Sequence, residues 1–130
     1  MTCATRMEDG RLIQSIRHVQ VSAPPNFEDA MRAFYADLLG LTEIPKPEIL
    51  RARGGVWCSC GALEIHVGVD AVPDNRSSRR HVALQAGDLN EVREALARGG
   101  IDVEEDQAPL DAFARLYCRD PAGNRVEFVQ

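Results

Sequence analysis

Two pairs of residues in this chain have side chains that bind divalent metals, and the spacing within each pair is the same. The pairs are His18 with Glu64 and His81 with Glu127. Imidazole nitrogens and carboxylate oxygens together suit Zn, Ni, Mn, Fe or Co, with water or substrate at the open positions of the ion. A closed structural zinc site would instead prefer thiolates. We therefore predict that all four residues are ligands of one divalent metal ion.

The sequence around the pairs is repeated as well. Arg17-His18-Val19 returns as Arg80-His81-Val82, and Leu63-Glu64-Ile65 returns as Val126-Glu127-Phe128. Similar segments at a fixed shift along a chain indicate a duplicated structural unit. Because both members of both pairs lie in matching apolar contexts, we favour duplication over a chance coincidence of spacing.

The first unit has the pattern of a strand, a helix and up to three further strands. Alternating apolar residues predict strands, and an apolar stripe of helical period predicts a helix. Asn26 is the expected N-cap of that helix, and Gly40 is expected to end it. The segment 41–51 contains two prolines, so we expect an irregular edge strand or a loop there. The predicted strands are 16–22, 56–60 and 63–69, and the predicted helix is 26–39.

The second unit repeats this order after a polar linker at 70–79. The segment Asp88 to Glu91 resembles a capping box and predicts a helix that ends at Gly99-Gly100. The predicted strands are 81–86, 101–103, 113–118 and 125–129. The fold class is therefore predicted as α+β, with two tandem βαβββ modules that form a curved, cup-shaped mixed sheet with helices on the outer face. We expect one domain over residues 1–130, with an arm at 1–12, module one at about 14–69 and module two at about 79–130.

The strand patterns also predict which way the candidate ligands point. Side chains alternate between the two faces of a strand, so Glu64 and Glu127 lie opposite their apolar neighbours. The two histidines also oppose the apolar faces of their strands, and all four residues are expected to meet inside the cup. His66 points the same way as Glu64 and could replace it as a ligand, or act beside it as an acid or base. We favour Glu64 because the repeat aligns it with Glu127.

Composition excludes several classes of protein. A chain of 130 residues with 45% hydrophobic and 27% charged residues has the composition of a single globular domain. The net charge of −5 argues against a general binder of nucleic acid or anionic membranes. No apolar run is long enough for a signal peptide or a membrane span, so we expect a cytoplasmic protein. The four cysteines lack a CxxC pair and are expected to be reduced thiols: Cys3, Cys58, Cys60 and Cys118.

Longer motifs in the chain resemble a known superfamily. These motifs are FYADLLGL at 34–41, RHVALQAGDL at 80–89 and DPAGNRVEFVQ at 120–130. Over residues 14–130 or so the chain resembles the vicinal oxygen chelate superfamily, which includes glyoxalase I, fosfomycin- and bleomycin-resistance proteins, methylmalonyl-CoA epimerase and extradiol dioxygenases. The resemblance implies a divalent metal that chelates vicinal oxygens of a small-molecule substrate and stabilises an enediolate. It also implies that a ligand carboxylate, Glu64 or Glu127, acts as the catalytic proton shuttle.

The chain departs from glyoxalase I at one position. Those enzymes usually place an arginine four residues after the first histidine, where this chain has Ser22, so glutathione chemistry is not expected. Further side chains could contact substrate or position a ligand, namely Gln20, Trp57, His66, Phe113 and Tyr117. An anionic substrate could be attracted by a set of arginines, namely Arg51, Arg53, Arg76, Arg79 and Arg80.

Three functions of different class remain open from the sequence. The first is a metal-dependent lyase or isomerase of the glyoxalase type. The second is a small dioxygenase or thiol transferase, in which His66 or Tyr117 could be the acid or base. The third is a bleomycin-resistance-type protein that binds a ligand without catalysis. The resemblance further implies a homodimer, while the loops that select the substrate carry no recognisable code.

Overall fold

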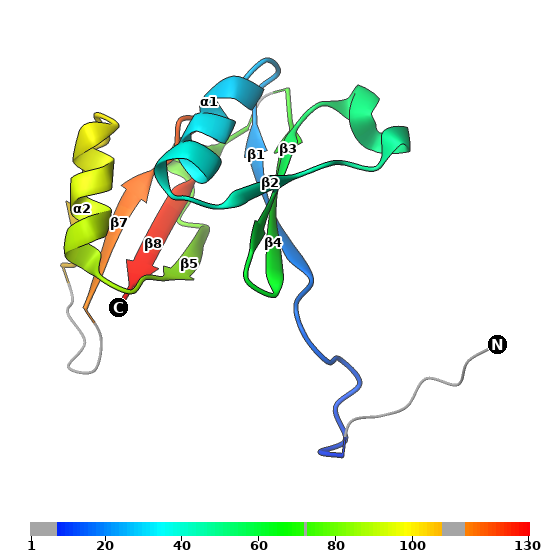
Figure 1. Ribbon diagram of the computed structural model, residues 1–130, viewed down its shortest axis with the longest axis horizontal. Coiled ribbons are helices and arrows are strands. Elements are labelled where there is room, and N and C mark those ends of the chain that lie inside the picture. The colour runs from blue at the N-terminus through cyan, green and yellow to red at the C-terminus, as the bar shows by residue number, and fades with distance from the viewer. Residues whose placement is uncertain (1–7, 72, 108–113) are drawn as a thin grey trace.

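The computed structural model describes residues 8–71, 73–107 and 114–130. The fold is α+β with two tandem modules, as predicted, and each module builds its own four-stranded mixed sheet (Figure 1). The strand order is β1-β4-β3-β2 in the first sheet and β5-β8-β7-β6 in the second. In both sheets the first and last strands of the module pair in parallel, and the other neighbours are antiparallel. The module limits given above stay a prediction.

Module one contains four strands, one helix that changes its winding, and a short 3₁₀ helix. Its elements are β1 (His18–Ala23), α1 (Glu28–Arg32), η1 (Ala33–Leu38), β2 (Thr42–Ile44), η2 (Glu48–Arg53), β3 (Val56–Cys60) and β4 (Leu63–Val69). The linker to module two carries η3 (Asn75–Ser77). Module two comprises β5 (His81–Gln85), α2 (Leu89–Arg98), β6 (Glu104–Glu105), β7 (Arg115–Arg119) and β8 (Arg125–Val129).

The helix predicted at 26–39 differs from the observed one in two ways. Asn26 is not its N-cap, because its backbone has the left-handed φ of 69° and Phe27 occupies the cap position without a side-chain hydrogen bond. The second half, η1, is a π-helix, in which the amide of Leu39 bonds to the carbonyl of Phe34. Phe34 and Tyr35 are both buried in it. The regular period of 3.6 residues on which the prediction rests does not reveal a π-helical turn.

Module two follows its predicted order with one shift. Asp88 caps α2, because its side chain accepts a hydrogen bond from the amide of Asn90 at 2.8 Å. The short strand predicted at 101–103 is absent, and β6 lies directly after it at Glu104–Glu105. The start of the strand predicted at 113–118, including Phe113, lies outside the described residues.

A single hydrophobic core joins the two modules. The apolar faces of both sheets pack with Met31, Phe34 and Tyr35 of the first helix and with Leu89 and Leu96 of α2. In Figure 1 the α1–η1 helix lies between the two sheets, and α2 lies beside β7 and β8. Burial of these apolar side chains is the main force that holds the modules together.

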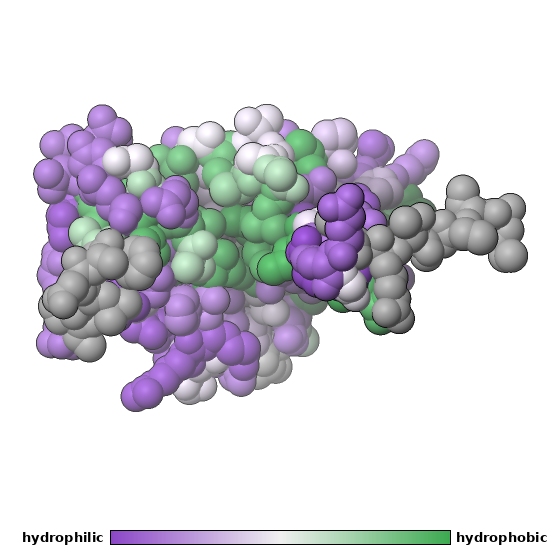
Figure 2. Space-filling view, turned by 90° about the horizontal axis from the view of Figure 1, so that it is seen from below, coloured by the Kyte–Doolittle hydropathy of each residue, from purple (hydrophilic) through white to green (hydrophobic). Residues whose placement is uncertain are grey.

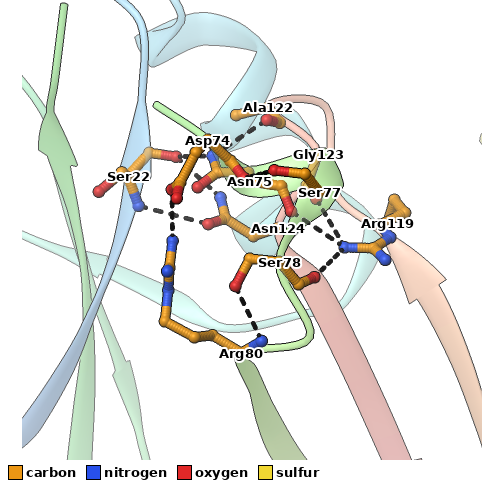
Figure 3. Close-up of polar contacts among 10 residues, drawn as sticks. All are labelled: Ser22, Asp74, Asn75, Ser77, Ser78, Arg80, Arg119, Ala122, Gly123 and Asn124. Atoms are coloured by element: carbon orange, nitrogen blue, oxygen red, sulfur yellow. Dashed lines mark hydrogen bonds and ion pairs between the residues drawn. The ribbon is translucent and has the colours of Figure 1, made fainter. Parts of the chain in front are cut away.

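Polar contacts also tie the end of β1 to the turn before β8 (Figure 3). The side chain of Asn124 donates to the carbonyl of Ser22 at 2.8 Å and accepts from its amide at 3.4 Å. Asn75 of the linker is buried and donates to the carbonyls of Ser22 and Ala122 at 2.8 and 3.0 Å. Asp120 accepts from the hydroxyl of Tyr35 at 2.7 Å. Backbone groups that face the module boundary are thereby satisfied by side chains.

Part of the molecule presents apolar residues to the surface. Residues 8–17 are all exposed and form an extended arm that leads away from the body before β1, and three of them are large and apolar: Leu12, Ile13 and Ile16. The face shown in Figure 2 has hydrophobic residues along its middle and hydrophilic residues at its margins. Among the described residues, none of the helices has the length and apolar character needed to cross a membrane.

Candidate metal centre

The first sheet carries a stack of three rings on its polar face. His66 of β4 lies between Trp57 and His18, with ring centroids 3.8 Å from Trp57 and 4.0 Å from His18. The planes are nearly parallel, at 5° and 13°. His66 Nε2 lies 2.8 Å from Glu64 Oε1. Two of the residues predicted as ligands, His18 and Glu64, are thus brought together around His66.

Burial differs sharply within this group. The side chain of His66 is only 7% exposed, whereas that of Glu64 is 38% exposed. The stacked rings and the carboxylate therefore hold the His66 imidazole in one orientation. A carboxylate bonded to one ring nitrogen of a histidine is the arrangement that commonly orients the other nitrogen toward a metal. The geometry allows Glu64 to act either as a ligand itself or as the group that orients His66.

The second sheet brings together His81, Glu127 and Tyr117. His81 Nε2 lies 3.4 Å from Glu127 Oε1, and the ring of Tyr117 meets His81 edge-on at a centroid distance of 5.9 Å. His81 Nδ1 lies 3.1 Å from the carbonyl oxygen of Arg79. A carbonyl oxygen can only accept a hydrogen bond, so Nδ1 is the donor in this contact, and Nε2 is the ring nitrogen that faces Glu127.

Glu127 and Tyr117 are both buried, although Glu127 is ionisable. The guanidinium of Arg125 lies 4.0 Å from the centroid of the Tyr117 ring, and that of Arg115 lies 4.0 Å from Glu127 Oε1. Burial, and then the neighbouring Glu127 carboxylate, raises the pKa of Tyr117. The phenol therefore keeps its proton at neutral pH and can serve as a hydrogen-bond donor at this site.

The strand register reveals a relation that the sequence repeat does not. In module one His18 pairs with Glu64, and Gln20 pairs with His66. In module two His81 pairs with Arg125, whereas Glu127 pairs with Ala83, two residues further along β5. Counted from the first strand of each module, the position of Glu127 therefore corresponds to His66 and not to Glu64.

Cross-strand neighbours support the same correspondence. His66 lies opposite Trp57 of β3, and Glu127 lies opposite Tyr117 of β7. The predicted strands 56–60 and 63–69 are separated by only two residues, and a two-residue turn there places Trp57 opposite His66, so this contact could be predicted from the sequence. The register between the parallel strands, β1 with β4 and β5 with β8, could not be predicted from the sequence. The connection between parallel strands is long, and a long connection does not set the register.

The predicted ligands form two groups within the described part of one chain. No cluster of three or more His, Cys, Asp or Glu side chains there is arranged to hold a metal ion. Each group nevertheless offers imidazole nitrogen beside carboxylate oxygen, a donor set that fits a divalent first-row ion. A cavity of about 310 Å³ lies between β1 and β5, and its lining includes Gln20, His81 and Arg125.

The remaining candidates are placed as follows. Gln20 is exposed on the face that carries His66, and Phe113 lies outside the described residues. Cys58 and Cys118 are buried and free, Cys60 is half-buried and free, and Cys3 lies outside the described residues. Burial raises the pKa of the Cys58 thiol and raises that of Cys118 to about 12, so both are poor nucleophiles near neutral pH.

Comparison with known proteins agrees with the fold. The chain is similar in structure to a glyoxalase family protein from Bacillus anthracis, with 45% sequence identity, a TM-score of 0.82, and coverage of 90% of this chain and 94% of that one. It is also similar to lactoylglutathione lyase from Agrobacterium tumefaciens, with 27% identity, a TM-score of 0.65 and coverage of 90% and 93%. The fosfomycin resistance protein FosX from Listeria monocytogenes shares the fold at 15% identity and a TM-score of 0.74, over 89% of this chain and 90% of that one.

No curated protein matches the sequence. A family model described as a glyoxalase-like domain matches residues 26–129, which is most of the chain and spans both modules. With the tandem modules and the similarity to the Bacillus anthracis protein, this match assigns the family. The chain belongs to the glyoxalase-like family within the vicinal oxygen chelate superfamily.

Proposed function

We propose that this protein is a metal-dependent lyase or isomerase of the glyoxalase type, acting on a small molecule with vicinal oxygens. The observation that carries the proposal is the presence of one imidazole and carboxylate pair on each of the two duplicated sheets, at 2.8 Å in the first and 3.4 Å in the second. The similarity to lactoylglutathione lyase from Agrobacterium tumefaciens favours this class of reaction. Ser22 argues against glutathione as a co-substrate.

The proposed metal ligands are His18, Glu64, His81 and Glu127, with His66 as the alternative to Glu64. A divalent metal bound there would act as a Lewis acid that stabilises negative charge on substrate oxygens. The chain's own residues would hold and move the proton. Glu127, buried beside Tyr117, and Glu64, bonded to His66, are the proposed proton acceptors.

A second candidate is a protein that binds its ligand without catalysis. It is favoured by one observation, the nearly parallel stack of Trp57, His66 and His18, since stacked rings are suited to binding a planar ligand. A dioxygenase or thiol transferase with His66 or Tyr117 as acid or base would use the same residues. The metal that the protein binds would separate these alternatives.

We also propose that the protein is a homodimer in which the two metal-binding groups meet across the interface. Leu12, Ile13 and Ile16 of the arm are exposed, and a groove of about 410 Å³ is lined by apolar residues that include Leu38, Leu84 and Phe128. A second copy of the chain would cover such surfaces. A cytoplasmic location fits the free thiols of the described cysteines.

The first experiment is the metal content of tag-free protein, measured by plasma mass spectrometry. We expect near-stoichiometric metal in the wild type and little in His81→Ala or Glu127→Ala. Glu94→Ala, which removes an exposed carboxylate of α2, is the matched control and should keep the metal. Zn, Ni or Co would direct assays to isomerisation, and Fe or Mn to oxygen consumption. If the wild type stays metal-free after incubation with each ion, the enzyme proposal is wrong and the binding protein remains.

A further inference from the structure

A separate cavity lies beside the ring stack of module one. Its volume is about 260 Å³, and its lining includes Gln20, Lys46, Leu50, Arg53 and Trp57. The cavity is bounded by the segment between β2 and β3 on one side and by β4 on the other. This segment contains the prolines that the sequence predicts as a loop, and it carries Arg53, one of the arginines named above as possible contacts of an anionic substrate.

The charges around this cavity are unbalanced. Two of its lining residues, Lys46 and Arg53, are cations, and none is an acid. Lys46 donates to the carbonyl oxygen of Gly54. Arg53 is exposed and makes neither a hydrogen bond nor an ion pair through its side chain with the residues that the structure describes.

One carboxylate lies close to the rim. Glu28 is near Gly54, and its Oε1 accepts a hydrogen bond from the amide of Gly55 at 3.2 Å. That bond fixes the carboxylate on the backbone of the loop, and Glu28 forms no ion pair with Lys46 or Arg53. Two cations therefore remain available to a negatively charged ligand.

The position of the cavity links it to the candidate metal centre. Gln20 and Trp57 both line it, and both are cross-strand neighbours of His66. Gln20 also lines the cavity between β1 and β5 that contains His81. A ligand held at Lys46 and Arg53 would extend past Trp57 toward the histidines of both modules.

We propose that this cavity binds the anionic end of the substrate, a carboxylate or a phosphate, through Lys46 and Arg53, while Trp57 packs against the adjoining part of the molecule. The substrate of the proposed reaction is then a small oxygen-rich anion. The identification as a substrate site rests on the proposed function, but the binding of an anion can be tested without metal. Arginine pairs with carboxylates and phosphates through two parallel hydrogen bonds, which makes Arg53 the better anchor of the two.

The chain has a single tryptophan, so the fluorescence of Trp57 reports on this cavity directly. Metal-free full-length protein, prepared with a chelator, would be titrated with inorganic phosphate and, separately, with succinate at constant ionic strength set by chloride. We expect a saturable change in emission with at least one of them. Arg53→Gln should weaken that binding by about tenfold, as expected for loss of a charge-assisted hydrogen bond.

Two further variants make the test specific. Arg51 is an exposed cation of the same 3₁₀ helix that was named above with Arg53, but it does not line the cavity. Arg51→Gln should therefore bind the anion as the wild type does. Lys46→Gln should also weaken binding, with circular dichroism to check that the loop contact to Gly54 is not needed for folding. The difference between phosphate and succinate identifies the anionic group.

The proposal is overturned if neither anion gives a saturable change, or if Arg53→Gln and Arg51→Gln have equal effects. This outcome is independent of the metal measurement. A protein that binds an anion but no metal would retain this site and lose the proposed enzyme function. A protein that binds metal but no anion would lose only this site.

Discussion

The two modules have the same scaffold but place different chemistry at the same position. In module one the cross-strand row is Gln20, His66 and Trp57, and in module two it is Ala83, Glu127 and Tyr117. The residues one step further along β3 and β7, Cys58 and Cys118, are both buried in the core. On the core side the two modules therefore carry the same type of residue, a buried cysteine. On the polar side, module one has a nitrogen donor and module two has an oxygen donor.

This difference shows how a duplicated fold can form an asymmetric site, with different residue types at equivalent strand positions. Pairing with the module's first strand fixes where a side chain projects, and the residue type then sets the charge. A buried imidazole between two rings is suited to neutral ligation, whereas a buried carboxylate beside a phenol is suited to proton transfer. The predictions below test this division, starting with the largest expected effect.

The first prediction concerns the choice between His66 and Glu64. If strand position decides ligation, His66→Gln should weaken metal binding by about 100-fold, and Glu64→Gln by only about tenfold through loss of an orienting contact. Competition with a chromophoric chelator gives both affinities. The electron paramagnetic resonance spectrum of the Cu-loaded protein should lose one nitrogen coupling in His66→Gln alone. The reverse order of affinities would restore Glu64 as the ligand.

The second prediction concerns a contact that has no counterpart in module one. Asp120 is buried and accepts hydrogen bonds from Tyr35, Asn124 and the backbone of Ala122, so Asp120→Ala leaves several donors unsatisfied. We expect it to lower the free energy of unfolding by about 3 kcal/mol. Asp88→Ala, which removes only a helix cap, should cost about 1 kcal/mol. Urea denaturation measures both, and equal losses would show that the Asp120 network contributes nothing beyond a local turn.

The third prediction compares the two buried thiols. The pKa of Cys118 is raised by burial from 9.0 to about 12, so its stabilising contribution is full below pH 9 and is lost as the pH rises toward 12. The pKa of Cys58 is also raised by burial. In a Cys3→Ser background we expect Cys60 to react first with a thiol reagent at pH 8, while Cys58 and Cys118 react only upon unfolding. Reaction of Cys118 in the folded state would contradict this burial.

The fourth prediction has the smallest effect and concerns two equivalent ion pairs. Arg32 with Glu43 and Arg93 with Glu105 each join the helix of a module to its edge strand through two hydrogen bonds. Glu43→Gln and Glu105→Gln should each lower Tm by no more than about 2 °C, because the pairs lie at the surface. The pKa of Glu105 is lowered by its hydrogen bond with Arg93, so its contribution is present above the unfolded pKa and is lost on acidification. Calorimetry at neutral and acid pH should show the Tm difference disappear in acid.

The sequence predicted the strands where alternation and turn residues agree. Residues 56–60, 63–69 and 125–129 are strands with the predicted limits. It did not predict η1 or β6, since a π-helix changes the period and a two-residue strand has no pattern of its own. The residue pairs of the candidate site could be recognised in the sequence as a repeat. The sequence did not show which positions of the two modules are equivalent, because only the pairing of the strands shows that Glu127 corresponds to His66.

The bonds between Ser22 and Asn124 also bear on how the protein is made. They join residues 102 positions apart in the sequence. During synthesis these bonds can form only after the segment that carries Asn124 has emerged from the ribosome, and until then water bonds to the backbone of Ser22. Long-range closures of this kind slow folding and expose strand edges in the meantime. The turn before β8 in the second module thus completes the hydrogen bonds at the end of β1 in the first.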